Sequence, residues 1–327
     1  RWLALPGAAV ATGLNDEPSP GALGVPGIVA ELRAARERWR TAQNRLQEVG
    51  GRELPSREAL AAVVGQLRGA LFPMRLGPPD LRQEHEDDYI AHTLQQALAE
   101  LLVQVRLELR HPARSADGTR SAAADEDADA RALAVVRAFG QSLPGIRALL
   151  DSDVLAAYEG DPAARSVDEV LLCYPGIQAM IHHRIAHRLY ELGTPLLARI
   201  VAELAHGETG IDIHPGARIG AGFFIDHGTG VVIGETAEIG RHVRLYQAVT
   251  LGARRFETDE EGHIQKGGAR HPLLEDDVVI YAGATVLGRV TIGRGSTIGG
   301  NVWLTHSVPP GSRITQAHPT STGPGVA

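Results

Sequence analysis

Two hydrophobic periods divide the chain near residue 207. In the first part, apolar residues recur at the three- and four-residue spacing that places them on one face of a helix. Amphipathic helices are predicted over 26–49, 86–109, about 129–140, 177–192 and 196–204. The acidic stretch 125–129 is interpreted as the end of a solvated loop, and Gly193 and Gly207 are the expected ends of the last two helices. The pattern predicts a helical domain over 26–206, preceded by a flexible segment over 1–25.

After residue 207 the apolar period changes to six residues, with one shift of two residues and one long interruption. The aliphatic positions are Ile213, Ile219, Ile225, Val231, Ile233, Ile239, Leu245, Leu251, Leu274, Ile280, Val286, Ile292, Ile298 and Leu304. Small or β-branched residues usually take the fifth place of each unit, and glycine often takes the second. This hexapeptide repeat predicts a left-handed parallel β-helix over 207–310, in which three units close one triangular coil. Residues 311–327 are expected to form a C-terminal tail.

Composition narrows the class of protein. The 327 residues carry a net charge of −7, which argues against a nucleic-acid-binding protein, because such proteins need a basic surface. No apolar run reaches the length of a membrane span, and the first six residues lack a signal-peptide pattern, so a cytoplasmic location is expected. The single cysteine, Cys173, excludes an intrachain disulfide and a cysteine-cluster metal site, and it is expected in the core.

Breaks in the repeat indicate where chemistry is placed. Two polar segments, 210–215 and 226–230, and an excursion at 253–272 interrupt it. Asp212 and His227 are fifteen residues apart, close to one coil, so they can lie on adjacent coils. A carboxylate behind an imidazole fixes its tautomer and supports the imidazolium formed when it takes a proton. The structural alternative is that Asp212 caps a turn and that His227 is an ordinary histidine.

A metal centre is a second alternative for the histidines of this part of the chain. These are His214, His227, His242, His263 and His271. Three convergent imidazoles between subunits would make a zinc site, as in the carbonic anhydrases built on this architecture. No close pair of histidines has a fitting spacing, and we therefore expect no metal.

Over about residues 150–310 the sequence resembles the serine acetyltransferases. The matching motifs are Gly160-Asp161-Pro162-Ala163, Tyr174-Pro175-Gly176, His183-Arg184-Ile185-Ala186-His187, Gly210-Ile211-Asp212-Ile213-His214-Pro215, Asp226-His227-Gly228-Thr229-Gly230, Val232-Ile233-Gly234-Glu235-Thr236, Val249-Thr250-Leu251-Gly252, Arg270-His271-Pro272 and Ser307-Val308-Pro309-Pro310-Gly311. Their order and spacing agree with the family except at the enlarged excursion.

The resemblance implies that acetyl-CoA and L-serine react to give O-acetylserine and CoA, the first step from serine to cysteine. By the same resemblance, His227 matches the general base and Asp212 the carboxylate that orients it. Asp161, Asp226, Arg270 and His271 match residues that hold serine. These residue types suit the task, because carboxylates bind an ammonium group and a guanidinium binds a carboxylate.

Acetyl-CoA is implied as a co-substrate and no permanently bound cofactor is expected. Positions that match the CoA site are Gly252, Ala253, Ala282 and Gly300. Lys266 and Arg255 are weaker candidates for binding the CoA phosphates, and the alternative is that both are simply exposed charges on a loop. The family forms trimers or dimers of trimers. Many members also bind O-acetylserine sulfhydrylase through a terminal isoleucine, whereas this chain ends in Ala327, so that complex stays open.

Two other functions are alternatives to serine acetylation. One is a hexapeptide acetyltransferase that acts on a sugar or an amino sugar, and the other is a non-catalytic hexapeptide scaffold. A neutral sugar lacks the ammonium and carboxylate that Asp161 and Arg270 would bind, and a scaffold would not depend on His227.

Overall fold

The computed structural model describes residues 23–43, 53–111, 122–255 and 267–316. Helix α1 (Val25–Ala42) belongs to one compact unit, and the described residues from 53 onward belong to a second. Lys266 and the greater part of the segments 1–25, 253–272 and 311–327 lie outside the described residues. Among the described helices, none combines the length and apolar character needed to cross a membrane.

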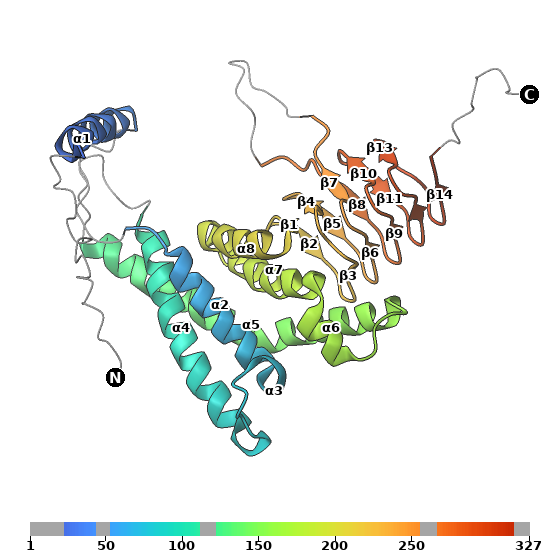
Figure 1. Ribbon diagram of the computed structural model, residues 1–327, viewed down its shortest axis with the longest axis horizontal. Coiled ribbons are helices and arrows are strands. Elements are labelled where there is room, and N and C mark those ends of the chain that lie inside the picture. Colours follow the sequence, from blue (N-terminus) through green and yellow to red (C-terminus); the bar gives the residue numbers. More distant parts are fainter. Residues whose placement is uncertain (1–22, 44–52, 112–121, 256–266, 317–327) are drawn as a thin grey trace, which may run out of the picture. The chain divides into compact units, whose positions relative to one another are not determined.

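In the described part of the second unit, seven α-helices and one short 3-10 turn precede the strands (Figure 1). They are α2 (Arg57–Leu71), α3 (Pro73–Leu76), η1 (Gln83–His85), α4 (Glu86–Arg110), α5 (Ala122–Gly160), α6 (Val167–Cys173), α7 (Pro175–Glu191) and α8 (Pro195–Thr209). Helices α4 and α7 confirm the helical periods predicted there, whereas α2 was not anticipated. Cys173 is exposed at the end of α6, so its predicted core position is wrong.

Two predicted helix ends differ from the structure. The acidic stretch 125–129 lies inside α5, because Asp125 falls in the first turn, where carboxylates are favoured, and Asp129 pairs with Arg110 at 2.6 Å. Helix α8 runs past Gly207 to Thr209 and is capped by Gly210, whose φ of 69° is left-handed. Glycine suits that position because it carries no Cβ. The chain therefore enters its first strand directly from a helix end.

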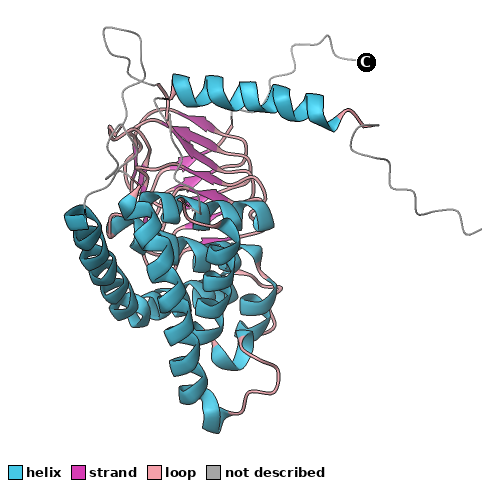
Figure 2. Cartoon of the chain, turned by 90° about the vertical axis from the view of Figure 1, so that its left-hand side faces the viewer, coloured by secondary structure: helices cyan, strands magenta, loops and turns pink. Residues whose placement is uncertain are grey.

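Three parallel sheets form the faces of a triangular prism, which confirms the predicted left-handed β-helix. Figure 2 shows short strands of the prism stacked one on another. Sheet A contains β1 (Asp212–Ile213), β4 (Val232–Ile233), β7 (Thr250–Gly252), β10 (Thr285–Leu287) and β13 (Trp303–Leu304). Sheet B contains β2 (Arg218–Ile219), β5 (Glu238–Ile239), β8 (Leu273–Leu274) and β11 (Thr291–Ile292). Sheet C contains β3 (Phe224–Ile225), β6 (Arg244–Leu245), β9 (Val279–Ile280), β12 (Thr297–Ile298) and β14 (Arg313–Ile314).

Each strand pairs with the strand three places further along the chain, which belongs to the next coil. One aliphatic residue from each coil therefore stacks on its counterpart in the next coil, inside the prism. In sheet A this column is Ile213, Ile233, Leu251, Val286 and Leu304. All five are nearly or fully buried. Because a single coil cannot bury its own inner face, the stacking of neighbours supplies the stability of the prism. The last strand, β14, extends the stack beyond residue 310.

A buried ion pair joins the helices to the first coil. Arg184 of α7 donates to both carboxylate oxygens of Asp153 of α5, at 3.1 and 3.2 Å, and both residues are almost fully buried. The same guanidinium donates to the carbonyls of Ile219 and Gly220, and the backbone N–H of Phe223 donates to Asp153 at 2.9 Å. Burial raises the pKa of the Asp153 carboxyl, and Arg184 opposes that effect.

Helix α7 also packs directly on the strand that leads to the next corner. Gly176 lies against Ile225 of β3, and a Cβ at this position would overlap the Ile225 carbonyl oxygen. The Tyr-Pro-Gly motif is therefore explained by close approach of a helix to a strand.

We expect Asp153→Ala to lower the free energy of unfolding by about 3–5 kcal/mol, because it leaves the buried guanidinium of Arg184 without its counter-ion. Urea denaturation of the variant and of the parent chain measures the difference. Asp151→Ala is the matched control, since Asp151 is exposed and pairs with Arg147 at 2.7 Å within one helix; that loss should stay below about 1 kcal/mol. Equal losses for the two variants would contradict the role given to the buried pair.

Candidate active site

The two-residue shift in the repeat lies at residues 226–231, between β3 and β4. The edge of the prism where sheet C joins sheet A is called here the C–A corner. Four residues connect β1 to β2, whereas six connect β3 to β4. The chain turns here through positive φ angles at His227 (61°), Gly228 (95°) and Gly230 (78°). The His227 side chain points outward from this corner and is 70% exposed.

Asp226 lies beside His227 and is held in place by a cation. Its Oδ2 accepts from Arg244 of β6 at 2.5 Å, and its Oδ1 lies 3.8 Å from His227 Nδ1. Arg244 also donates to the Gly160 carbonyl at 2.7 Å and stacks over the ring of Phe224. The sequence analysis did not identify Arg244 as a site residue. It is an outward-facing residue of a regular strand, and no sequence motif shows which side chains lie beside it once the coils are stacked.

Asp161 reaches the same cluster from the end of α5. It accepts hydrogen bonds from the Tyr174 hydroxyl and from the Ala163 backbone N–H. The bond from Tyr174 is the main cause that lowers the pKa of Asp161, and the same bond raises the pKa of Tyr174 to about 12. His227 and Arg244 act on Asp161 electrostatically. The structure thus brings together Asp161, Asp226 and His227, which the sequence separates by up to 66 residues.

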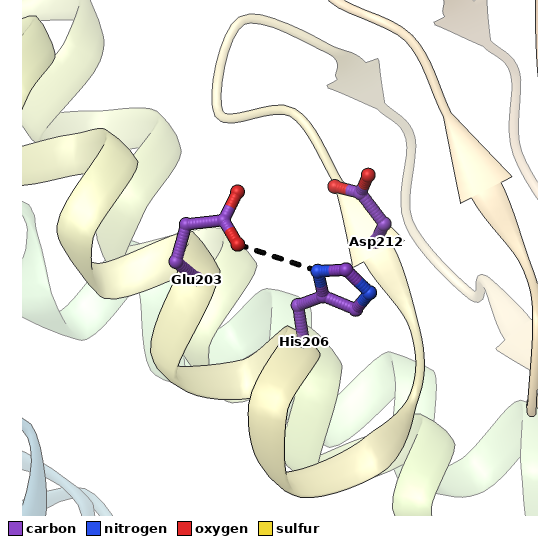
Figure 3. Close-up of side chains that lie close together, drawn as sticks. All are labelled: Glu203, His206 and Asp212. Atoms are coloured by element: carbon purple, nitrogen blue, oxygen red, sulfur yellow. Dashed lines mark hydrogen bonds and ion pairs between the residues drawn. The ribbon is translucent and has the colours of Figure 1, made fainter.

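Asp212 begins β1 on the coil next to this corner. Its backbone N–H donates to Val231 at 2.9 Å, so Asp212 and His227 belong to neighbouring coils at one corner. Within the described part of the chain, no hydrogen bond or ion pair joins their side chains. The Asp212 carboxylate lies instead near Glu203 and His206 of α8 (Figure 3). Pairing of Asp212 with His227 therefore stays a prediction.

Arg270 and His271 lie at another corner, which joins sheet A to sheet B and is called here the A–B corner. Arg270 pairs with Glu235 at 2.5 Å, and Tyr190 of α7 donates to the other Glu235 oxygen at 3.0 Å. The Thr236 hydroxyl accepts from the backbone N–H of both Arg270 and His271, at 2.9 and 3.1 Å. Glu235 and Thr236 thus fix the two predicted residues, a role that the motif alone did not reveal.

His271 is neutral and fixed in one tautomer by its neighbours. Its Nδ1 accepts from the Thr236 backbone N–H at 3.1 Å, so the network assigns the ring proton to Nε2. Burial is the main cause that lowers the pKa of His271 to about 4. Gly234 makes room for the ring, because a Cβ there would overlap it.

The positions expected to contact CoA divide between two ends of sheet A. Gly252 ends β7 and Ala253 follows it, whereas Ala282 and Gly300 lie at the C–A corner on successive coils. Arg255 is exposed, and Lys266 lies outside the described residues. Gly252 and Ala253 therefore lie at the opposite edge of sheet A from Ala282 and Gly300.

The histidines weighed as zinc ligands do not converge among the described residues. His227 and His242 lie at two different corners of the prism, whereas His214 and His271 share the A–B corner. The one group of three potential ligands that the described part of the chain brings together is Glu203, His206 and Asp212. His263 lies outside the described residues.

Comparison with known proteins first gives the class. A family model described as bacterial transferase hexapeptide (six repeats) matches residues 271–306. These residues form the later coils of the prism along the chain, from the corner before β8 to just past β13. Together with the parallel prism, the match identifies these coils as hexapeptide repeats of the kind found in bacterial transferases.

Comparisons over most of the chain give the family. The plasmid serine acetyltransferase of Synechococcus elongatus is 59% identical over 266 residues, which cover 81% of this chain and 82% of that protein. Serine acetyltransferase 1 of Entamoeba histolytica, solved with L-cysteine, is 38% identical with a TM-score of 0.67, covering 78% of this chain and 86% of that one. The Neisseria gonorrhoeae enzyme, solved with serine, is 29% identical with a TM-score of 0.51, covering 78% and 95%. This chain belongs to the serine acetyltransferase family.

The low pKa of His271 predicts a pH-dependent contribution to stability. The folded state keeps the ring neutral, whereas an unfolded histidine takes a proton near its ordinary pKa of 6.5. The contribution is therefore fully present above about pH 6.5 and is lost as the pH falls toward about 4. We expect the stability difference between the parent chain and His271→Gln to shrink over this interval, as measured by urea denaturation at each pH.

His242→Gln is the control for this experiment, because the His242 side chain is 68% exposed. The buried His182 and His183 also favour the neutral form, but they are common to both proteins and cancel in the difference. The half-buried His214 favours the neutral form as well and acts electrostatically on His271, with a smaller effect on the ring than burial has. A difference for His271→Gln that did not change with pH would contradict the assignment.

Proposed function

We propose that this chain transfers the acetyl group of acetyl-CoA to the hydroxyl of L-serine, giving O-acetylserine and CoA, the step that commits serine to cysteine synthesis. The observation that carries the proposal is the expanded corner of the repeat, where the exposed His227 lies beside the carboxylates of Asp226 and Asp161 in a chain of this family. Because acetyl-CoA is an intracellular thioester, we also expect the protein to act in the cytoplasm.

His227 is the proposed general base. It takes the proton of the serine hydroxyl while the oxygen attacks the thioester carbonyl carbon. The tetrahedral intermediate then collapses, the C–S bond breaks, and the proton passes from His227 to the CoA sulfur. A positioned base contributes typically about 10²–10⁴-fold to such a step. Asp212, on the adjacent coil, is the proposed carboxylate that stabilises the imidazolium, and both side chains must rotate toward one another to do so.

The charges at the two corners suit the two ends of an amino acid. Asp161 and Asp226 carry negative charge beside His227, which favours the serine ammonium group. Arg244 already neutralises part of the Asp226 charge, so Asp161 is the more available partner. Arg270, held by Glu235, offers its guanidinium to the serine carboxylate, and the neutral His271 beside it is the remaining proposed contact.

Two different corners supply these groups, and this separation supports assembly as part of the proposal. Within one prism, Asp161, Asp226 and His227 lie at the C–A corner, whereas Arg270 and His271 lie at the A–B corner. If prisms pack side by side as a trimer, a C–A corner of one copy meets an A–B corner of the next. The same packing would join Gly252 and Ala253 to Ala282 and Gly300 as one groove for acetyl-CoA, with Lys266 as a phosphate partner.

We expect His227→Ala to lower the rate of serine acetylation by at least about 100-fold without affecting assembly, because the base is removed and no buried contact is lost. CoA release is measured with acetyl-CoA and L-serine, and sedimentation reports the assembly. His242→Ala is a closely matched control: its φ is 55°, its side chain is 68% exposed and it lies 3.5 Å from Asp277.

Unchanged turnover in His227→Ala would refute the base. The same assay with homoserine, threonine and sugars as acceptors tests the substrate class, and a sugar accepted better than serine would overturn the proposed reaction.

We expect Arg270→Ala to raise the KM for serine by about 10–100-fold, the effect of losing a charged hydrogen bond of about 1.5–3 kcal/mol, and to leave the KM for acetyl-CoA nearly unchanged. Steady-state kinetics with each substrate varied in turn measures both constants. Arg294→Ala, which removes an exposed arginine paired with Asp276, is the control. Equal increases in both constants for Arg270→Ala would contradict a serine-specific contact.

A further inference from the structure

We propose that Glu203, His206 and Asp212 form a binding site for a divalent transition-metal ion, of which Zn²⁺ is the best fit, and that occupation of this site inhibits acetyl transfer. The three residues come from two elements that meet at Gly210. Glu203 and His206 lie three residues apart near the end of α8, so their side chains lie on the same side of the helix (Figure 3). Asp212 faces them from the start of β1.

The distances suit a small cation after minor side-chain rotation. One ligand atom from each residue lies within 4.8 Å of the others, and Glu203 Oε2 is 3.3 Å from His206 Nδ1. Zinc bonds of about 2.0–2.2 Å in a tetrahedron place ligand atoms about 3.4 Å apart. One edge of the site is therefore already at the required length. A Glu-x-x-His pair on a helix is also a known metal-binding arrangement in carboxylate-bridged bundles.

The ligand atoms are available to a metal ion. In the described part of the chain, no donor or cation bonds the Asp212 carboxylate, although Asp212 is half-buried. Arg199 holds the Oε1 atom of Glu203 at 2.5 Å, which orients the carboxylate and leaves Oε2 turned toward His206. The Glu203 and His206 side chains are 35% and 46% exposed, so an ion can enter from solvent.

The donor set indicates the kind of ion. Two carboxylates and one imidazole suit Zn²⁺ and similar first-row ions better than Mg²⁺, which prefers oxygen ligands alone. Arg199 balances one of the carboxylate charges, and the second remains to attract a cation. Three protein ligands leave a fourth position for water.

Inhibition follows from the double use of Asp212, and this part rests on the proposed function. The carboxylate that is proposed to orient His227 is also the ligand that β1 contributes to the metal. A bound ion would hold Asp212 toward α8 and deprive the imidazolium of its counter-ion. Metal binding and catalysis therefore compete for one side chain.

Titration with Co²⁺, whose visible absorption is intense when it is four-coordinate, tests the site directly in the full-length chain. We expect one Co²⁺ per chain, displaced by Zn²⁺, and a loss of affinity of at least about 10-fold in His206→Asn. His242→Asn, which alters an exposed histidine paired with the single carboxylate of Asp277, should bind as the parent does. Absence of binding, or equal affinity of His206→Asn and the parent chain, overturns the site.

Activity is measured by the O-acetylserine formed, because the CoA thiol itself binds zinc. Zn²⁺ at its binding concentration should reduce turnover of the parent chain, and a chelator should restore it. His206→Asn should match the metal-free parent in turnover and resist Zn²⁺. Binding without inhibition overturns the inhibitory role. A metal-free parent that failed to acetylate serine would overturn the proposed function together with that role, whereas the Co²⁺ titration would still decide the site.

Discussion

The buried guanidinium of Arg184 is the constraint on which the arrangement of the second unit depends. A charge withdrawn from water must find its partners within the protein, and here these partners come from two places: the carboxylate of Asp153 on α5 and the carbonyls of Ile219 and Gly220 on the first coil. Satisfying them fixes α5 and α7 against the bottom of the prism. That position in turn brings Asp161, at the end of α5, to the corner that carries His227.

The regularity of the prism and the chemistry of its corners have separate causes. Stacked aliphatic residues specify the coils, and any position in a perfect repeat is equivalent to the next. The site arises where equivalence is broken, by two added residues at the C–A corner and by the excursion before Arg270. His242 illustrates the distinction, because it shares a positive φ, exposure and a nearby carboxylate with His227, yet it lies in a regular four-residue connection between β5 and β6, whereas His227 lies in the six-residue connection between β3 and β4.

Asp212 is the most consequential residue for regulation. It lies where the last turn of a helix, the first strand and the active corner meet, and no hydrogen bond within the described residues commits its carboxylate to one of them. On one side is the proposed base, and on the other is a pair of metal-binding side chains. A carboxylate with two competing uses couples catalysis to any ligand that secures it on one side.

The sequence by itself determined the division into helices and prism, the three-strand coil and the family, because a six-residue period and short motifs are local properties of the chain. It also placed His227 at an irregularity of the repeat. It did not reveal the roles of Arg244, Glu235 and Gly234 or the Glu203–His206 pair, and it misplaced Cys173 and the start of α5. Only the tertiary structure decided these, since burial, ion pairing and the overlap of a ring with a glycine depend on residues that become neighbours after the coils stack and the helices pack against them.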